Sequence, residues 1–509
     1  MLVEECDTLC EESSAPAIQP EASGALHARA IRGGSILIAC KWAAQIVSWT
    51  VTLAVARLLS PEDYGVVAAA GVLLGLSDLF AEAGVGRALV QKPGITPRDY
   101  DRAFTLSLVL SLGCYAMLFA SAPAAARFLR TPELTTVLPV MGVVILLVPY
   151  RTVPQGILDR NLQLKSQGVL FLISTGLQAA TVFGLALAGA GYWSLVLGAT
   201  LARLFECVSL AAVTGWRPRV VADLHGSRAL LSYGLWISGG SFLWYFYSNS
   251  DFAVVGRLEG PVVLGYYSLA FQLMSLPAQK ITANINQVAF PVFCRLQGDR
   301  AKVREWFLRL SVLMNAVVLP TLLGGALVAA DGMQTLFGAK WLPAVLPFRI
   351  LCVVGLLSVI SSSLVSLLNA LGRPDVNFRY TAACACVFPP AFAIAGQMYG
   401  VIGVCLAWVF VYLLAVGLML AATRSITGLG LGDYLAAQAP ALIAGTIMAA
   451  AVLLVGQQFA GRAPAPLRLM LEVATGVATY AGVLWIVAQD TIVADLRTFR
   501  RTLRGDLAG

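Results

Sequence analysis

Apolar residues gather in long blocks that are separated by short breaks of charged residues, proline and glycine. The first block, Gly33–Arg57, is 25 residues long. A helix rises about 1.5 Å per residue, so such a block can cross the ~30 Å hydrocarbon core of a bilayer. The same pattern along the chain predicts about fourteen transmembrane helices. They span about residues 34–58, 64–90, 103–124, 134–157, 167–189, 192–214, 233–256, 263–290, 307–330, 344–370, 377–398, 400–422, 435–457 and 467–488.

The composition agrees with a chain that is mostly embedded in lipid. Hydrophobic residues make up 58% of the 509 residues and charged residues 12%, and the mean hydropathy is +0.79. Soluble domains carry about 25% charged residues. Because only helices and closed barrels satisfy every backbone hydrogen bond in lipid, these blocks predict an all-α integral membrane protein.

The breaks between the blocks leave no room for a soluble catalytic domain. The longest, Gly215–Ser232 and Pro291–Trp306, are each under twenty residues. The sequence contains neither a phosphate-binding glycine loop nor a carboxylate-rich metal cluster. Cys6 and Cys10 form a lone pair without further zinc ligands. We therefore expect no enzymatic activity, no metal and no cofactor.

Lysine and arginine are divided unevenly between the two sides of the predicted bundle. With the N-terminus inside, 25 of the 35 basic residues lie on the inner side, 8 on the outer side and 2 within helices. The positive-inside rule then places both termini in the cytoplasm, with a disordered tail over residues 1–32 and a second tail over 489–509. Although the net charge is +8, the basic residues form no patch, so we expect the bilayer as a partner and no nucleic acid.

One short motif occurs twice, with an offset of 200 residues. The matching residues are Arg57, Pro61 and Gly65 in one copy and Arg257, Pro261 and Gly265 in the other. Six helices separate the copies, and since six is even, both halves have the same orientation about an axis along the membrane normal. This predicts two six-helix lobes in a parallel pseudo-twofold repeat, followed by two additional helices. Their ranges are 33–214 and 233–423 for the lobes, 215–232 for a cytoplasmic linker and 424–488 for the additional helices.

Both copies of the motif lie in stretches that resemble a known family. The stretches are ARLLSPEDYGVVAAAGVLLGLSDLFAEAGVGRALVQKP, DFAVVGRLEGPVVLGYYSLAFQL, VPQGILDRNLQLKSQ and LNALGRPD. They resemble polysaccharide flippases of the Wzx type, in the multidrug/oligosaccharidyl-lipid/polysaccharide superfamily, over roughly residues 30–430. The resemblance implies two six-helix lobes plus two helices in a bacterial inner membrane. It also implies transfer of an undecaprenyl-pyrophosphate-linked oligosaccharide to the periplasmic leaflet for exopolysaccharide, O-antigen or capsule synthesis, with a polysaccharide polymerase or copolymerase as a further partner.

Five charged residues fall inside the apolar blocks. Placing each charged side chain inside the bilayer costs at least roughly 2.5–3.5 kcal/mol of free energy, so each needs a structural or functional reason. At about 1.5 Å per residue, three of them share a layer somewhat past the midplane toward the cytoplasm, and Asp251 lies near the periplasmic end of its helix. The five are Lys41, Asp78, Glu82, Asp251 and Lys280.

Two helical stripes are candidates for binding an anionic headgroup. Lys41, Gln45 and Ser48 share one helix face, and Lys280 and Asn284 share another. If these stripes face a cleft between the lobes, they could bind a pyrophosphate. The alternative is that these polar side chains only form hydrogen bonds between neighbouring helices.

Basic residues at the predicted cytoplasmic mouths, Arg87, Arg151 and Arg160, could attract the same headgroup or serve only as topological anchors. Asn249 accompanies Trp244 and other aromatic residues, which suits either sugar contacts or an interfacial belt.

The acidic residues are candidates for ion coupling. Asp78 and Glu82 are four residues apart on one helix face, so their mutual repulsion could make the pair a proton or cation carrier. The alternative is a simple ion pair of Glu82 with Lys41. The family resemblance places an acidic residue at Asp251, before the glycine motif, and we interpret the glycines and prolines of that motif as short turns.

Alternating access of the two lobes to the two membrane faces is the predicted mechanism. A cation-coupled multidrug exporter of the same superfamily is the main alternative. A membrane-embedded polysaccharide polymerase is disfavoured, because acid–base chemistry on a sugar needs catalytic residues in sizeable loops.

Overall fold

The computed structural model describes residues 20–92, 94–222 and 227–503, and every element within them is helical. The elements are α2 (Pro20–Leu58), α3 (Pro61–Glu82), α4 (Val85–Gln91), α5 (Pro97–Phe128), α6 (Leu134–Leu146), α7 (Val148–Arg160), α8 (Leu164–Leu187), α9 (Tyr192–Thr214), α10 (Ser227–Leu296), α11 (Arg300–Leu327), α12 (Ala329–Gly332), the π-helix η1 (Met333–Phe337), the 3-10 helix η2 (Ala339–Ala344), α13 (Val345–Ala370), α14 (Pro374–Thr427), α15 (Leu431–Phe459) and α16 (Ala465–Leu503).

Two of these helices are too long for single membrane spans. α10 has 70 residues and α14 has 54, whereas a bilayer needs about 20. In each of these helices the chain reverses direction at a glycine with positive φ. These glycines are Gly260 (φ 80°) in α10 and Gly400 (φ 60°) in α14. Glycine reaches such angles without a steric penalty, so each helix consists of two arms.

The number of spans agrees with the sequence pattern. Among the described residues, eleven helices are long and apolar enough to cross a membrane, and α14 is one of them. If α14 counts as two spans and the two arms of α10 are added, the total number of spans is consistent with the predicted fourteen.

Some helix ends differ from the predicted ones. α2 begins at Pro20, inside the predicted disordered tail, because residues 20–32 are rich in alanine, the best helix former. Residues 1–19 of that tail lie outside the described part. α3 ends at Glu82, because Ala83 and Gly84 have left-handed backbones with φ of 42° and 68°.

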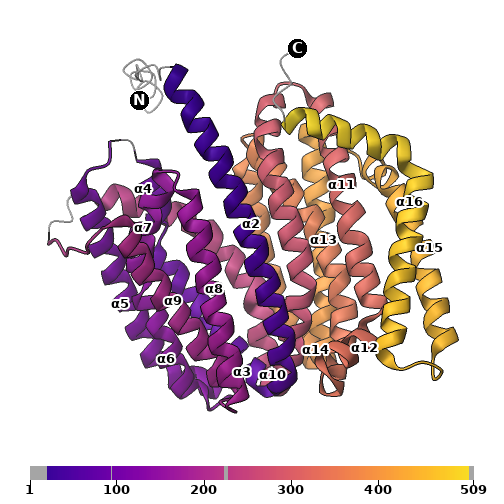
Figure 1. The fold of residues 1–509 in the computed structure, drawn as a ribbon, viewed down its shortest axis with the longest axis horizontal. Coiled ribbons are helices and arrows are strands. Elements are labelled where there is room, and N and C mark those ends of the chain that lie inside the picture. Colours follow the sequence, from indigo (N-terminus) through magenta and orange to yellow (C-terminus); the bar gives the residue numbers. More distant parts are fainter. Residues whose placement is uncertain (1–19, 93, 223–226, 504–509) are drawn as a thin grey trace.

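The helices form two lobes that stand side by side (Figure 1). α3–α9 make one lobe, α10–α14 make the other, and α15 and α16 lie on its outer side. α2 crosses obliquely from the end at which α2 begins and α16 ends, here called the terminus face, to the opposite end. That opposite end carries Leu58 and Pro61 and is called the hinge face. The chain therefore has the predicted all-α architecture of two lobes plus two helices.

The two copies of the repeated motif touch each other at the hinge face. A Cβ atom on Gly65 would lie 1.7 Å from the carbonyl oxygen of Pro261, and one on Gly265 would lie 1.7 Å from that of Pro61. The contact is reciprocal, as expected for elements related by a twofold axis. The motif glycines therefore lie inside helices, where they permit a backbone-to-backbone approach, and not in turns.

A second contact joins the lobes farther along α3. Tyr245, in the first arm of α10, donates a hydrogen bond from its hydroxyl to the carbonyl oxygens of Gly71 (3.2 Å) and Val72 (2.9 Å). Gly75 leaves room for this ring, because a Cβ there would lie 2.2 Å from the phenolic oxygen. α3 thus packs along both arms of α10.

The C-terminal end of α2 is held by the other lobe. Lys340 Nζ donates to the carbonyl oxygens of Leu59 (2.6 Å) and Arg57 (2.8 Å). The Trp341 indole is fully buried, and its Nε1 donates to the Ala56 oxygen at 2.8 Å. A cation on the last carbonyls of a helix also interacts favourably with the helix dipole.

The same end of α2 also donates hydrogen bonds to the other lobe. The Arg57 guanidinium donates through Nε to the carbonyl oxygen of Leu336 (2.7 Å) and through Nη2 to that of Thr335. Both carbonyls belong to η1, so each lobe supplies a cation to a helix of the other lobe. We call the side chains of Arg57, Lys340 and Trp341 the hinge latch.

We predict that Gly65→Ala destabilises the protein by about 1–3 kcal/mol, since the added methyl would force the two backbones apart. Thermal unfolding in detergent measures the effect as a lower Tm. Gly113→Ala in α5 is the matched control, because nothing lies within 4 Å of its Cβ position. Equal Tm values for the two variants would contradict a tight backbone contact.

We predict that Lys340→Met loosens the hinge latch, because two hydrogen bonds between the lobes are lost. Amide hydrogen exchange over residues 333–344 should become about tenfold faster. Arg127→Met serves as control, since the exposed Arg127 bonds only within its own helix, to the Pro123 oxygen at 3.2 Å. If both variants exchange at the wild-type rate, Lys340 does not hold the lobes together.

Candidate functional site

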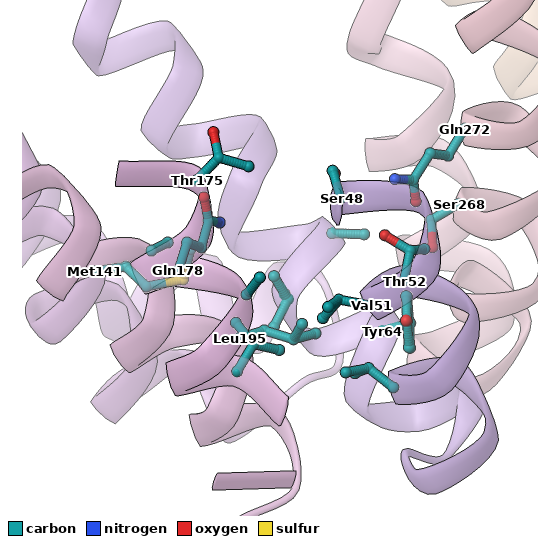
Figure 2. Close-up of a pocket in the computed structure, with 16 residues that line it drawn as sticks. Ser48, Val51, Thr52, Tyr64, Met141, Thr175, Gln178, Leu195, Ser268 and Gln272 are labelled. Atoms are coloured by element: carbon teal, nitrogen blue, oxygen red, sulfur yellow. The ribbon is translucent and has the colours of Figure 1, made fainter. Parts of the chain in front are cut away.

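A cavity of about 390 Å³ lies between the lobes and is called the inter-lobe cavity. Figure 2 shows Thr175 and Gln178 of α8 on one side of it, and Ser268 and Gln272 of the second arm of α10 on the other. The lining contains no charged residue among the described side chains. It comprises Ser48, Val51, Thr52, Val55, Tyr64, Val67, Ala68, Met141, Thr175, Gln178, Ala179, Val182, Leu195, Ala199, Ser268 and Gln272.

A larger cavity of about 760 Å³ lies within the second lobe and is called the C-lobe cavity. Both arms of α10, α13 and both arms of α14 enclose it. It too is lined without a charged residue in the described part of the chain. The lining comprises Gly240, Ser241, Trp244, Tyr247, Ser248, Phe271, Met274, Ser275, Ala278, Gln279, Thr282, Ala283, Val354, Ser358, Ser361, Ser362, Val365, Pro374, Asn377, Phe378, Tyr380, Thr381, Trp408 and Tyr412.

Asp251 lies behind the wall of the C-lobe cavity and not in its lining. Its side chain is fully buried and accepts hydrogen bonds from the Tyr267 hydroxyl (2.5 Å) and from Trp408 Nε1 (2.8 Å). The backbone N–H of Phe252 donates a third, at 2.9 Å. Because charged hydrogen bonds satisfy this buried carboxylate, Asp251 holds the Trp408 indole that lines the cavity.

Lys41 and Gln45 lie on the same face of α2 as Ser48 and Thr52, which line the inter-lobe cavity. Lys41 is seven residues from Ser48, or about 10 Å along the helix. Its side chain is exposed. Among the described residues no ion pair joins Lys41 to Glu82 or to any other carboxylate. Lys41 therefore lies about two helical turns from the inter-lobe cavity, on the helix face that lines it.

Lys280 is the residue after Gln279, which lines the C-lobe cavity, and both side chains are exposed. No ion pair of Lys280 is found within the described part of the chain. Consecutive helical residues do not share a face, so Lys280 lies outside the lining of the C-lobe cavity. The side chains of Asn284 and Arg87 lie outside the described residues.

Asn249 is turned toward its own helix. Its Nδ2 donates to the Tyr245 carbonyl (2.9 Å) and to the Ser248 hydroxyl (3.1 Å), so the amide lies outside both cavity linings.

The two acidic candidates of α3 are half-buried. Asp78 lies close enough to the Tyr245 hydroxyl to interact with it electrostatically. Glu82 is the last residue of α3, directly before the left-handed Ala83.

The arginines at the terminus face have different surroundings. Arg160 Nη1 donates to the carbonyl of Lys92 at 2.7 Å, beyond the C-terminal end of α4. Arg151 is half-buried and lines neither cavity.

The sequence analysis missed the hydroxyl groups of α13. Ser358, Ser361 and Ser362 all line the C-lobe cavity. The available signal was the triplet Ser361–Ser363 within an otherwise apolar block. Serines often join helices in membranes, so the triplet alone did not indicate a cavity.

Solved structures with the same architecture confirm the fold. The lipid II flippase MurJ, in an inward closed conformation, is 14% identical and has a TM-score of 0.72, covering 89% of this chain and 100% of that one. An inward-facing multidrug resistance MATE family transporter of the MOP superfamily is 16% identical, with a TM-score of 0.59 over 74% of this chain and 95% of that one.

Relatives of known name also share much of the sequence. The lipopolysaccharide biosynthesis protein WzxC of Escherichia coli K12 is 27% identical over 70% of this chain and 73% of its own length. The succinoglycan biosynthesis transport protein ExoT of Rhizobium meliloti 1021 is 30% identical over 56% of this chain and 58% of its own. A family model described as polysaccharide biosynthesis protein matches residues 54–346, more than half of the chain. The protein therefore belongs to the polysaccharide biosynthesis protein family, as its paired motifs predict.

Proposed function

We propose that this protein moves a polyprenyl-pyrophosphate-linked oligosaccharide from the cytoplasmic to the periplasmic leaflet of a bacterial inner membrane, for the synthesis of a surface polysaccharide. One observation carries the proposal: the two-lobed bundle contains two cavities whose described linings carry hydroxyl groups and no charge, and the exposed Lys41 lies on the helix face that lines one of them. The names of the relatives, a transport protein and a lipopolysaccharide biosynthesis protein, support it. The substrate crosses the membrane without a change in its covalent bonds.

The pyrophosphate would bind at Lys41 and Lys280. Ammonium groups are compact cations that bind phosphate oxygens through charge-assisted hydrogen bonds. Their cost at bilayer depth is consistent with a functional role. Gln45 supplies amide donors beside Lys41, and Arg87 and Asn284 are further candidates for the headgroup.

Transport would proceed by alternating access, with residues 33–214 and 233–423 moving as lobes relative to each other. The excess of basic residues on the predicted inner side supports a cytoplasmic location of both termini. The hinge latch would then close the periplasmic side and would have to open for release. Asp78 and Glu82 are candidates for ion coupling, since a membrane potential supplies about 2.3 kcal/mol per charge per 100 mV. A polysaccharide polymerase or copolymerase would receive the substrate.

The chemistry of the cavities favours a glycolipid over a cationic drug. A carboxylate in the lining would compensate the charge of a cationic drug. The described linings contain no carboxylate, and Asp251 is buried behind one of them.

We predict that Lys41→Ala combined with Lys280→Ala slows glycolipid translocation in proteoliposomes at least about tenfold, because charge-assisted bonds to the pyrophosphate are lost. The substitutions Lys41→Arg and Lys280→Arg keep the charge and should retain most of the activity.

Lys302→Ala is the matched control for that experiment, since Lys302 is exposed and pairs with Asp299 at 3.4 Å on its own helix. A double alanine variant that transports as fast as Lys302→Ala would rule out the cationic headgroup site.

Drug sensitivity separates the flippase from an exporter. We predict that deleting the gene leaves sensitivity to lipophilic cations unchanged, while lipid-linked oligosaccharide accumulates in the cytoplasmic leaflet. Greater drug sensitivity without such accumulation would favour the exporter.

A further inference from the structure

We propose that the C-lobe cavity binds uncharged sugar residues of the transported glycolipid. This inference rests on the proposed function and assigns the sugar part of the substrate to one lobe. The cavity volume of about 760 Å³ lies within the range of roughly 300–1,000 Å³ that is typical of ligand sites.

The absence of charge around the cavity selects a neutral ligand. No lining residue in the described part carries a charge. The nearby Asp251 carboxylate is fully buried and is bonded to Tyr267 and Trp408, so it does not face the cavity. A uronate or phosphate group would have to leave water without a cation to compensate, which is unfavourable.

The lining hydroxyls suit a ligand that is rich in hydrogen-bond donors. Ser275, Thr282 and Ser358 donate to carbonyl oxygens of their own helices, at 3.1, 2.6 and 2.7 Å. Each hydroxyl oxygen keeps lone pairs that can accept a hydrogen bond from a sugar. The Gln279 amide, which has no partner in the described part of the chain, can donate in return. A polyprenyl chain in the cavity would leave the Gln279 amide and the free lone pairs of these hydroxyls without partners.

Aromatic side chains supply the apolar part of a sugar site. Trp244 and Phe378 line the cavity and remain 53% and 52% exposed, so their faces are accessible to a ligand. The electron-rich face of an aromatic ring attracts the partly positive C–H bonds of a sugar ring. The inter-lobe cavity has about half this volume, and Tyr64 is its single aromatic residue among those described. The C-lobe cavity is therefore the better sugar site.

Binding to the full-length protein in nanodiscs tests the inference with three probes. These are undecaprenyl pyrophosphate, the same carrier with a neutral hexose oligosaccharide, and the same carrier with an oligosaccharide of equal length that contains a uronic acid in each position. Wild type should bind the neutral glycolipid most tightly. Trp244→Ala and Ser358→Val should each weaken binding of the neutral glycolipid about fivefold more than binding of the bare carrier.

Trp485→Ala is the matched control, because Trp485 is 64% exposed on α16 and lines neither cavity. Thermal unfolding verifies that every variant is folded. If wild type binds none of the probes, the proposed function itself is wrong. If wild type prefers the neutral glycolipid but both cavity variants behave like Trp485→Ala, the sugar site is overturned while the proposed function stands. Equal wild-type affinity for the uronic acid probe would overturn the neutral specificity.

Discussion

The backbone contact between the two copies of the repeated motif constrains the rest of the bundle. Gly65 and Gly265 let each lobe approach a proline carbonyl of the other so closely that no side chain fits between them. The contact holds the two lobes together at the hinge face and leaves room for cavities farther along the helices. Packed interfaces of this kind have discrete arrangements and do not deform continuously, which suits two lobes that rock between two states.

The hinge latch adds hydrogen bonds between the lobes to this backbone contact. Lys340 and Arg57 each use a positive charge to cap carbonyls of the opposite lobe. Such bonds have modest net free energies, because water can replace them when the face opens. The glycine contact and the latch thus have different roles: the first sets where the lobes meet, and the second stabilises one of their relative positions.

The hydrophobic pattern was sufficient to predict the spans, because lipid forces long apolar helices. The repeated motif predicted the two lobes, and the stretches around it indicated the family. The site was harder to predict. Asp251 looked like a transport residue, but its partners Tyr267 and Trp408 are 16 and 157 residues away, so only the fold reveals that the carboxylate is satisfied. The hydroxyls of α13 were missed for a related reason: a serine in an apolar helix does not show locally whether it faces a neighbour or a cavity. The roles of Lys41 and Lys280 stay predictions.

The central claim is that the anionic headgroup binds between the lobes and that the sugars lie in the second lobe. A cryo-electron microscopy map of the full-length protein in nanodiscs, saturated with its lipid-linked oligosaccharide, tests this most directly. The account predicts pyrophosphate density within hydrogen-bonding distance of Lys41 or Lys280, continuous with sugar density in the C-lobe cavity. Headgroup density remote from both lysines, with the C-lobe cavity empty, would contradict it.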